Sequence, residues 1–190
     1  CCSSLYRNDA PARQLASLAM ATALGIVDAL HEYGIKAQTK WPNDVLVGDA
    51  KIAGILCELR PGSAVIGIGL NVSMSAAEAA RIDQPATSIL IETGTVQAPR
   101  EVLPILLQVL SRRLQAWQEG GFAGLRSDWC RHCLALGQDI TIDDGDTRQT
   151  GVLAGFGDAG QLLLQPHDLA QDGSSTPVEI WSGHLRLTNR

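Results

Sequence analysis

Several classes of protein are disfavoured by what this sequence of 190 residues lacks. It contains no basic run and carries a net charge of -5, whereas a nucleic-acid binder needs clustered Lys and Arg to neutralise phosphates. No apolar run reaches the ~18 residues of a membrane span, and no signal peptide is visible at the start. The cysteines are odd in number (5) and irregularly spaced, which argues against a secreted disulfide framework. We therefore expect no membrane partner and a reducing cytoplasm.

Common catalytic and cofactor motifs are also missing. The sequence has no Gly-x-Ser-x-Gly elbow and no Walker A loop. The Gly67–Asn71 stretch (Gly-Ile-Gly-Leu-Asn) lacks the third glycine of a dinucleotide fingerprint, although a strand glycine often marks the close approach of a ligand. Cys130 and Cys133 have the spacing of zinc ligands, but no second pair of ligands is suitably spaced. We interpret these two cysteines as helix residues near a domain boundary.

What is present is an ordinary globular composition. Hydrophobic residues make up 45% and charged residues 18% of the chain, which suffices for a sizeable core. The length allows one medium domain, or one domain with a small appendage. Because the chain opens with Cys-Cys-Ser-Ser-Leu-Tyr and not with Met, we expect it to begin within an element, with further sequence upstream.

The first half of the chain predicts one helix followed by strands. Asp9 and Pro11 are typical of a helix start, apolar residues then recur at helical spacing, and Gly34 suits the stop. A strand is predicted over 36–40, a hairpin over 45–47 and 52–59 with a Gly-Asp turn, and a buried strand over 64–70. Three strands in a row favour an antiparallel or mixed sheet.

The second half predicts helices and then short strands. A small helix over 76–82 is capped by Ser75, and helices over 101–119 and 122–133 are separated by Gly120-Gly121. The apolar face of the first long helix is predicted to comprise Leu103, Leu106, Leu107, Leu110, Leu114 and Trp117. Beyond residue 136, short apolar runs alternate with turn signals, as in a small β-barrel. His167 and His184 fall in this region without an acid or nucleophile pattern, and we predict them to be surface residues. The fold class is therefore α+β.

The segment Lys40–Asp44 (Lys-Trp-Pro-Asn-Asp) and the nearby Lys51 are the strongest candidates for chemistry. Two lysines, an amide and a carboxylate in a strand–turn–strand context suit an anionic ligand that also carries a base or a metal. Asp44 could hold Mg²⁺, and Asn43 could contact a base. Taken singly, each has a simpler interpretation, because lysines are usually solvated and Asn-Asp after Pro is common turn chemistry.

These residues resemble a known family. The segments Lys40–Asp44, Lys51–Glu58 (Lys-Ile-Ala-Gly-Ile-Leu-Cys-Glu) and Gly67–Val72 are similar, in order and spacing, to motifs of biotin protein ligases, the biotin–[acetyl-CoA-carboxylase] ligases. The resemblance implies a catalytic domain over 1–135, incomplete at its N-terminus, and an SH3-like β-barrel over 136–190. It also implies two steps. Biotin and MgATP give biotinyl-5′-AMP, and a lysine of the biotin carboxyl carrier protein then takes the biotinyl group.

The resemblance also implies roles for individual residues. Lys51 would contact biotin and the adenylate linkage and act in catalysis with Asp44, which would serve Mg²⁺ or the phosphates. Gly54 would allow close approach of biotin. The nucleotide side would be lined by Lys40, Asn43, Gly69 and Asn71. A homodimer is an assembly that the resemblance leaves open.

Two features depart from the family pattern. The glycine- and arginine-rich loop that closes over biotin and the adenylate is absent from this chain, so we expect the chain itself to be impaired. Near the C-terminus, Gly183–Thr188 differs from the family's usual acidic residue and later arginine; whether Arg186 replaces that arginine near the ATP phosphates is left open, and it is not among the predicted site residues. Two alternatives remain, a bifunctional ligase and biotin-responsive repressor, and a lipoate- or octanoate-type acyl ligase. DNA would be a partner only if an upstream domain exists.

Overall fold

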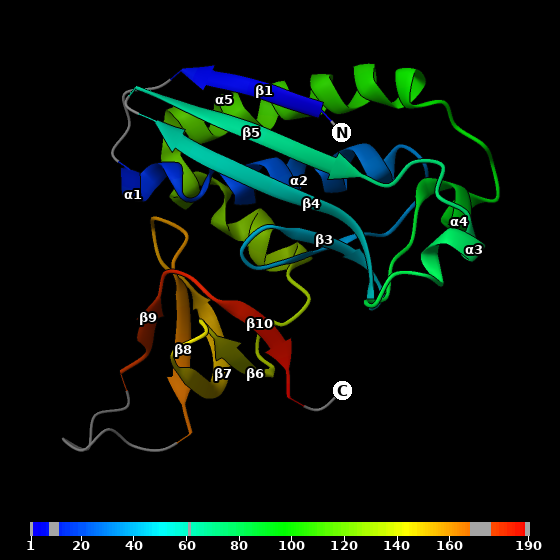
Figure 1. Cartoon of the computed structure of the whole chain (residues 1–190). Coiled ribbons are helices and arrows are strands. Elements are labelled where there is room, and N and C mark those ends of the chain that lie inside the picture. The colour runs from blue at the N-terminus through cyan, green and yellow to red at the C-terminus, as the bar shows by residue number, and fades with distance from the viewer. Residues whose placement is uncertain (1, 8–11, 61, 168–175, 189–190) are drawn as a thin grey trace.

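The computed structural model of the protein describes residues 2–7, 12–60, 62–167 and 176–188, which form two antiparallel sheets and five helices (Figure 1). The strands of the first sheet, from one edge to the other, are β1 (Cys2–Arg7), β5 (Ser63–Leu70), β4 (Ala50–Arg60), β3 (Asp44–Val47) and β2 (Gln38–Lys40). Each neighbouring pair is antiparallel, so the α+β class and the predicted 45–59 hairpin are confirmed. Strand β1 was not predicted as a strand.

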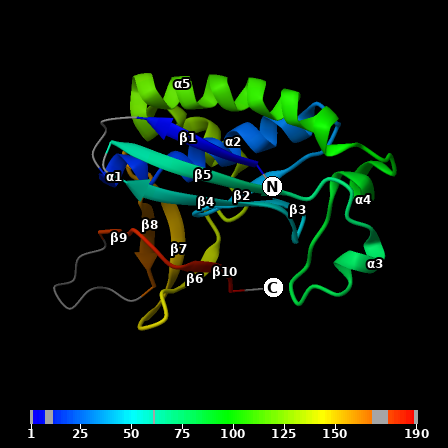
Figure 2. The same ribbon diagram turned by 45° about the horizontal axis from the view of Figure 1, so that its top comes forward.

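The helices lie mainly on one face of this sheet. They are α1 (Ala12–Leu15), α2 (Leu18–His31), α3 (Ala76–Ala79), α4 (Ile89–Thr93) and α5 (Pro99–His132). Figure 2 shows α5 running along one side of the β1–β5–β4 strands. Strand β5 explains this one-sided packing, because Ala64, Ile66 and Ile68 are buried while the alternating Gly67 and Gly69 face the other way.

The predicted first helix is two helices, α1 and α2, separated near Ser17. The Ser17 hydroxyl donates to the carbonyl of Gln14, which satisfies the backbone at this break. Helix α2 is buried along most of its length because it lies between the sheet and α5. The predicted start at Asp9 and Pro11 lies outside the described residues.

Helix α5 contains the predicted interruption, since Gly121 adopts φ 61° and kinks the helix there. Its predicted apolar face was partly wrong. Leu103 and Leu107 are 38% and 47% exposed, whereas Val102 and Val109 are buried. Leu106, Leu110 and Trp117 are buried as predicted, but Val102 and Val109 complete the stripe in place of Leu103 and Leu107, since neighbours along a helix differ by about 100° in direction. Leucines beside the stripe therefore reach solvent.

The second sheet follows α5. From edge to edge its strands are β10 (His184–Leu187), β6 (Asp139–Asp143), β7 (Arg148–Phe156), β8 (Leu162–Pro166) and β9 (Val178–Ile180). All neighbouring pairs are antiparallel, as expected of a small barrel, although closure into an SH3-like barrel stays a prediction. His167 and His184 are exposed as predicted, but His167 does have an acid neighbour, with its Nε2 3.0 Å from Asp139 Oδ1. The sequence could not place that neighbour because the two residues are distant along the chain.

The two sheets are joined through one continuous hydrophobic core. Phe122 and Trp129 of α5 and Phe156 of β7 form an edge-to-face aromatic cluster at the junction, with ring centroids 5.8 to 6.5 Å apart. The division at 135/136 therefore stays a prediction. Among the described residues, none of the helices combines the length and apolar character needed to cross a bilayer.

Candidate active site

Four of the predicted site residues form a row across the outer face of the first sheet. Lys40 pairs with Asp44, Asp44 with Gly54, and Gly54 with Gly69, on strands β2, β3, β4 and β5. Directly paired residues of antiparallel strands share a face. Because Gly69 alternates with the buried Ile68, this row lies on the face opposite the long helices.

A β-bulge places Lys51 over this row. Val45 pairs with Ala53 and Leu46 pairs with Lys51, so Ile52 is an extra residue in β4. Both Ile52 and Ala53 are buried, at 0% and 2% exposed. Without the bulge, strict alternation would turn Lys51 away from the face that Gly54 occupies; the bulge re-aims its side chain.

Lys51 and Asp44 form an ion pair above Gly54. The Lys51 Nζ lies 2.6 Å from Asp44 Oδ1, with the two side chains 30% and 24% exposed. A Cβ at Gly54 would lie 3.0 Å from Lys51 Cε, 3.1 Å from Nζ and 3.5 Å from the Asp44 carboxylate. The absence of a side chain at position 54 is therefore what leaves room for the pair. The sheet thus presents an ammonium and a carboxylate on a glycine floor.

Asn43 fixes the turn that carries Asp44. Its Nδ2 donates to the Ile55 carbonyl at 2.7 Å, and the Ile55 backbone N–H donates back to the Asn43 carbonyl at 2.9 Å. The side-chain amide is thus occupied by the neighbouring strand. Asn43 does not line the cavity beside Lys51 described below.

Asn71 connects β5 with the segment between α3 and α4. Its Nδ2 donates to the Thr87 carbonyl at 3.0 Å and lies 3.4 Å from the Lys51 carbonyl. The same segment pairs with Lys51 itself, because Lys51 N donates to Pro85 O at 2.9 Å and Thr87 N donates to Lys51 O at 3.0 Å. Residues 85–87 therefore form a wall beside the lysine. This wall was not predicted, since nothing local in the sequence indicates such a long-range pairing.

A cavity of about 190 Å³ lies beside Lys51. Its lining residues are Lys51, Ala53, Gly54, Gly69, Asn71, Ile82, Gln84 and Ala86. Four predicted site residues thus meet in one cavity. Lys40 lies apart from them and lines a second cavity of about 340 Å³ with Asp49 and Arg186 of the C-terminal sheet. A volume of 190 Å³ is below the range of about 300–1,000 Å³ usual for small-molecule sites, so a larger ligand would extend over the open sheet face.

The open face next to this cavity is apolar. Leu56 of β4 pairs with Gly67 of β5, one step along the outer face from the Gly54–Gly69 pair, and is 64% exposed. Leu5 of β1 lies on the same face and is 57% exposed. Leu56 falls within the recognised Lys51–Glu58 motif, but its outward direction follows only from strand alternation, and the sequence interpretation missed it. An ammonium beside an apolar surface suits a ligand with one anionic and one apolar part.

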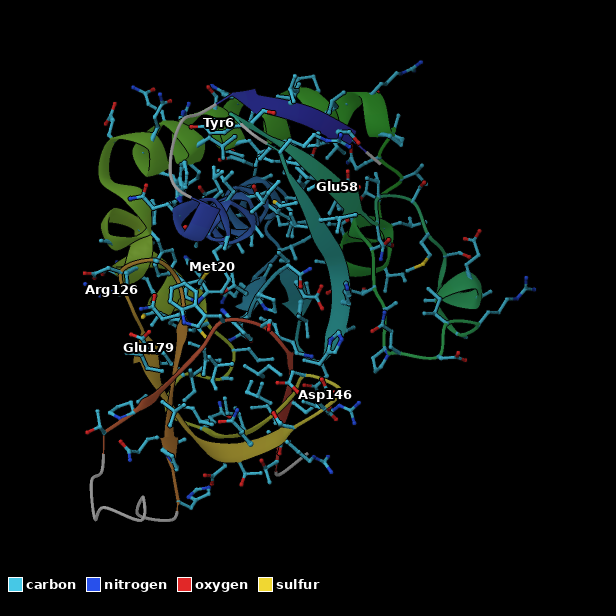
Figure 3. The ribbon with its side chains drawn as sticks, turned by 60° about the vertical axis from the view of Figure 1, so that its left-hand side comes forward. Tyr6, Met20, Glu58, Arg126, Asp146 and Glu179 are labelled. Carbon is cyan, nitrogen blue, oxygen red and sulfur yellow. The ribbon has the colours of Figure 1, made fainter. Side chains whose placement is uncertain are left out.

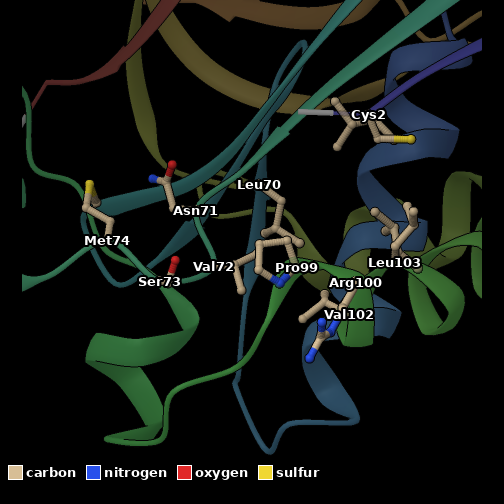
Figure 4. Close-up of a pocket in the computed structure, with 12 residues that line it drawn as sticks. Cys2, Leu70, Asn71, Val72, Ser73, Met74, Pro99, Arg100, Val102 and Leu103 are labelled. Carbon is tan, nitrogen blue, oxygen red and sulfur yellow. The ribbon is translucent and has the colours of Figure 1, made fainter.

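A larger cavity of about 470 Å³ lies between the end of β5 and the start of α5 (Figure 4). Leu70, Val72, Val102 and Leu103 give it a mainly apolar lining, and Asn71 borders both this cavity and the one beside Lys51. We place the candidate chemistry at the smaller cavity, because it is lined by Lys51, the partner of Asp44, whereas Lys51 does not line the larger one.

A divalent cation would find a single carboxylate at this site. Asp44 is the only acid in the row, and no group of three or more His, Cys, Asp or Glu side chains gathers at a metal-binding distance in the described parts of the chain. Mg²⁺ commonly uses one or two carboxylates together with substrate phosphates. One carboxylate thus fits an ion that arrives bound to a nucleotide. In this structure the Asp44 carboxylate is paired with Lys51.

The cysteines of the Cys-x-x-Cys pair lie at the C-terminal end of α5, as predicted. Cys133 is buried, and burial raises the pKa of its thiol to about 11. Burial likewise raises the pKa of Cys130. Both groups are therefore protonated thiols at neutral pH and poor nucleophiles.

Comparison with known proteins gives this geometry a family. Residues 3–75, which include the whole Lys40–Asn71 region, match the Biotin/lipoate A/B protein ligase family. The biotin–[acetyl-CoA-carboxylase] ligase of Paracoccus denitrificans is 32% identical over 160 residues, covering 79% of this chain and 67% of that protein. The chain belongs to the biotin protein ligase family. The resemblance inferred from the three motifs is confirmed.

Further relatives agree with this membership. The bifunctional ligase/repressor BirA of Bacillus subtilis is 27% identical over 94% of this chain, which spans 57% of that protein. The structure of the Aquifex aeolicus biotin protein ligase in complex with biotin and ATP superposes with a TM-score of 0.78 at 28% identity, covering 98% of this chain and 77% of that one. This chain thus spans between 57% and 77% of the length of these three relatives.

Proposed function

We propose that this chain carries the adenylate-forming site of a biotin–[biotin carboxyl carrier protein] ligase. The observation that carries the proposal is the Lys51–Asp44 pair above Gly54, beside a cavity and an open apolar face. Biotin combines an apolar ring and chain with one carboxylate, and ATP supplies the second anion. The site offers a counterpart for each. The structure of the Aquifex aeolicus relative was solved in complex with these two molecules.

In the first step a biotin carboxylate oxygen attacks the α-phosphorus of ATP, and pyrophosphate leaves. The reactants are both anions, so their approach needs positive charge fixed in position. The Lys51 ammonium supplies that charge, because the bulge and the Gly54 floor hold it over the sheet. An exposed lysine elsewhere would be more strongly screened by water.

In the second step the amine of a carrier-protein lysine attacks the acyl carbon of biotinyl-5′-AMP, AMP leaves, and the new amide loses a proton. Lys51 stabilises the negative charge that develops on the departing phosphate oxygen. Leu56 and Gly67 would contact the apolar part of biotin, with no side chain at position 67 in the way. Gly69 and Asn71 would border the nucleotide, and Asn43 would act by holding its turn.

Mg²⁺ bound to the ATP phosphates would neutralise charge on the leaving pyrophosphate. Asp44 is the residue that would hold the ion, as predicted from the sequence. Lys40 would support the phosphates from the neighbouring cavity, where Arg186 offers a second cation. Because Arg186 belongs to β10, the C-terminal sheet would contribute a positive charge to the site through this cavity.

The alternatives have less support. A bifunctional repressor is an activity of some relatives, such as the Bacillus subtilis protein, and would require a DNA-binding part in addition to this site. A lipoate-type ligase shares the matched family, but the related enzymes above are named for biotin. Four points stay predictions: that the partner is a biotin carboxyl carrier protein, that the chain forms a homodimer, that it is located in the cytoplasm, and that the domain boundary lies at 135/136.

Because the chain itself is expected to be impaired, the proposal is tested with the chain in excess over biotin in the presence of MgATP. Biotinyl-5′-AMP is measured by chromatography, and biotin transfer to a carrier domain is then measured by streptavidin blot. We expect Lys51→Ala to lower adenylate formation about 100-fold or more. Lys36→Ala removes an exposed lysine that lines neither the cavity beside Lys51 nor the one beside Lys40, and it serves as the matched control. Equal adenylate formation by both variants would contradict the role of Lys51. Preference for lipoate over biotin in the same assay would support the lipoate alternative.

A further inference from the structure

Trp41 lies within the segment that carries the predicted phosphate and metal residues, directly after Lys40 at the end of β2 and before Asp44 at the start of β3. Its side chain is only 3% exposed, and it lies with Met20 and Gly160 around a small cavity that is distinct from the one beside Lys51. The indole Nε1 donates a hydrogen bond of 3.1 Å to the carbonyl of Gly160, 119 residues further along the chain. Gly160 belongs to the turn between β7 and β8 of the C-terminal sheet.

The Gly160 turn is shaped to receive this contact. Gly160 has φ +89°, and a Cβ there would lie 2.7 Å from Met20 Sδ and 3.0 Å from Ser17 Cβ. Glycine is therefore required by both conformation and space. The turn is closed by two backbone hydrogen bonds, from Gly157 N to Gln161 O at 2.8 Å and from Gly160 N to Gly157 O at 3.1 Å. The acceptor carbonyl is thus held in a fixed direction.

This β7–β8 turn is also attached to α5. Arg126 pairs with Asp158 at 2.7 Å, and Phe156 packs edge-to-face on Phe122 and Trp129. Figure 3 labels Met20 and Arg126, which lie where the helices meet the C-terminal strands. The Gly160 carbonyl is therefore fixed relative to the helices as well as to its own sheet.

The Lys40–Asp44 segment is consequently held from two sides. On one side Asn43 exchanges two hydrogen bonds with Ile55 of β4. On the other side Trp41 is bonded to Gly160. We propose that Trp41 is a positioning residue, through which the C-terminal sheet fixes Lys40 and Asp44 for MgATP. The effect on MgATP rests on the proposed function, whereas the mechanical coupling does not.

The test uses Trp41→Phe, which keeps an aromatic ring and removes the N–H donor. Trp117→Phe is a matched control: Trp117 is 2% exposed and its Nε1 donates at 2.9 Å to Ser17 Oγ. Because Ser17 lies beside Gly160, this control disturbs the same surroundings but leaves the Trp41–Gly160 bond in place. Both changes remove one buried indole hydrogen bond, so both should lower the melting temperature similarly. We expect only Trp41→Phe to raise the Kd for MgATP, about 5- to 10-fold by calorimetry, with the Kd for biotin changed less than 2-fold.

A second readout needs no ligand. The Ile55 amide is bonded to the Asn43 carbonyl, so its hydrogen exchange reports opening of the turn. Trp41→Phe should accelerate this exchange about 5-fold or more relative to Trp117→Phe. Equal exchange in the two variants would overturn the coupling. If the unaltered chain fails to bind MgATP, the proposed function fails, and exchange at Ile55 still decides the positioning role.

Discussion

At the scale of single residues, Gly54 is the position where the smallest change should most disturb the site. A methyl group at 54 would lie 3.0 to 3.1 Å from the end of the Lys51 side chain, so the lysine must shift by a few tenths of an ångström from its place beside Asp44. Because that neighbour is flexible, the fold should tolerate Gly54→Ala with little loss of stability. We expect adenylate formation to fall about 10-fold or more, through loss of the fixed positive charge. Adenylate formation and the melting temperature are measured together.

Gly124→Ala is the control for this change, because nothing lies within 4 Å of a Cβ at the exposed position 124 of α5. It should leave adenylate formation unchanged and stabilise the helix by ~0.5–1 kcal/mol. A Gly54→Ala variant that retains full activity would show that the room above Gly54 is unnecessary.

The residues of the site were predictable to different degrees. Lys51, Asp44 and the two glycines stand within a few residues of one another or in ordered motifs, so their types and spacing indicate the chemistry. Residues 85–87 and Leu56 were missed, for different physical reasons. Residues 85–87 pair with Lys51 across a long loop that carries no local sequence signal. The exposure of Leu56 at the site depends on which of its residues β4 directs to the outer face. Which side chains reach the outer face is decided by the register of the strands, and a single β-bulge changes that register.

At the scale of elements, Arg113 links three helical segments. It donates to Asp28 of α2 at 2.6 and 3.0 Å, and to Asp128 beyond the Gly121 kink at 2.6 Å. The two carboxylates, Asp28 first, hold the pKa of Arg113 above its usual range. Arg113 is only 19% exposed, so its loss should cost about 2 kcal/mol, between the values for exposed and buried pairs. Denaturant unfolding of Arg113→Ala measures this.

The matched control is Arg60→Ala, because the Arg60–Glu58 pair is mostly exposed, at 65% and 57%. This variant should unfold within about 0.5 kcal/mol of the unaltered chain. If both variants lose the same stability, the Arg113 network does not brace the kink.

The same network predicts a dependence on acid pH. The Arg113 guanidinium, by its hydrogen bond, holds the pKa of the Asp128 carboxyl below its ordinary value. A carboxylate with a lowered folded-state pKa contributes stability that is present above the unfolded value of about 3.9 and disappears as pH falls through the folded value. The stability difference between the unaltered chain and Arg113→Ala should therefore be constant from about pH 5 to 7 and shrink below about pH 4. A difference that stays constant down to pH 2 would contradict this origin.

Elements with strong local signals were the predictable ones. The 45–59 hairpin, the strand over 64–70, Ser75 as a helix cap and the break at Gly121 follow from turn chemistry and periodicity. Strand β1 and the short helix α4 were missed. Strand β1 pairs only with the distant β5, and four or five residues of helix give too little periodicity to recognise.

At the scale of the whole molecule, the chain combines two sheets that the sequence suggests are separate units. Trp129 is fully buried against Phe122 and Phe156, and these three rings belong to both parts. Trp41 adds a hydrogen bond across the same junction. A cut at residue 135/136 would expose this surface to water, at a cost of roughly 25 cal/mol per Å² of apolar area. The two sheets should therefore depend on each other for stability.

This dependence predicts a single unfolding transition. Calorimetric and van't Hoff enthalpies should agree, because the shared core leaves no stable half. Phe156→Leu should lower the one melting temperature by roughly 2–4 °C per kcal/mol lost, and it should accelerate hydrogen exchange at Ile55 in the first sheet as well as at Leu153 in the second. Val178→Ala, at a position 40% exposed in β9, is the control and should leave both unchanged. Two separate transitions, or faster exchange confined to Leu153, would show that the sheets are independent domains and that the contribution of the C-terminal sheet to the site is not transmitted through the core.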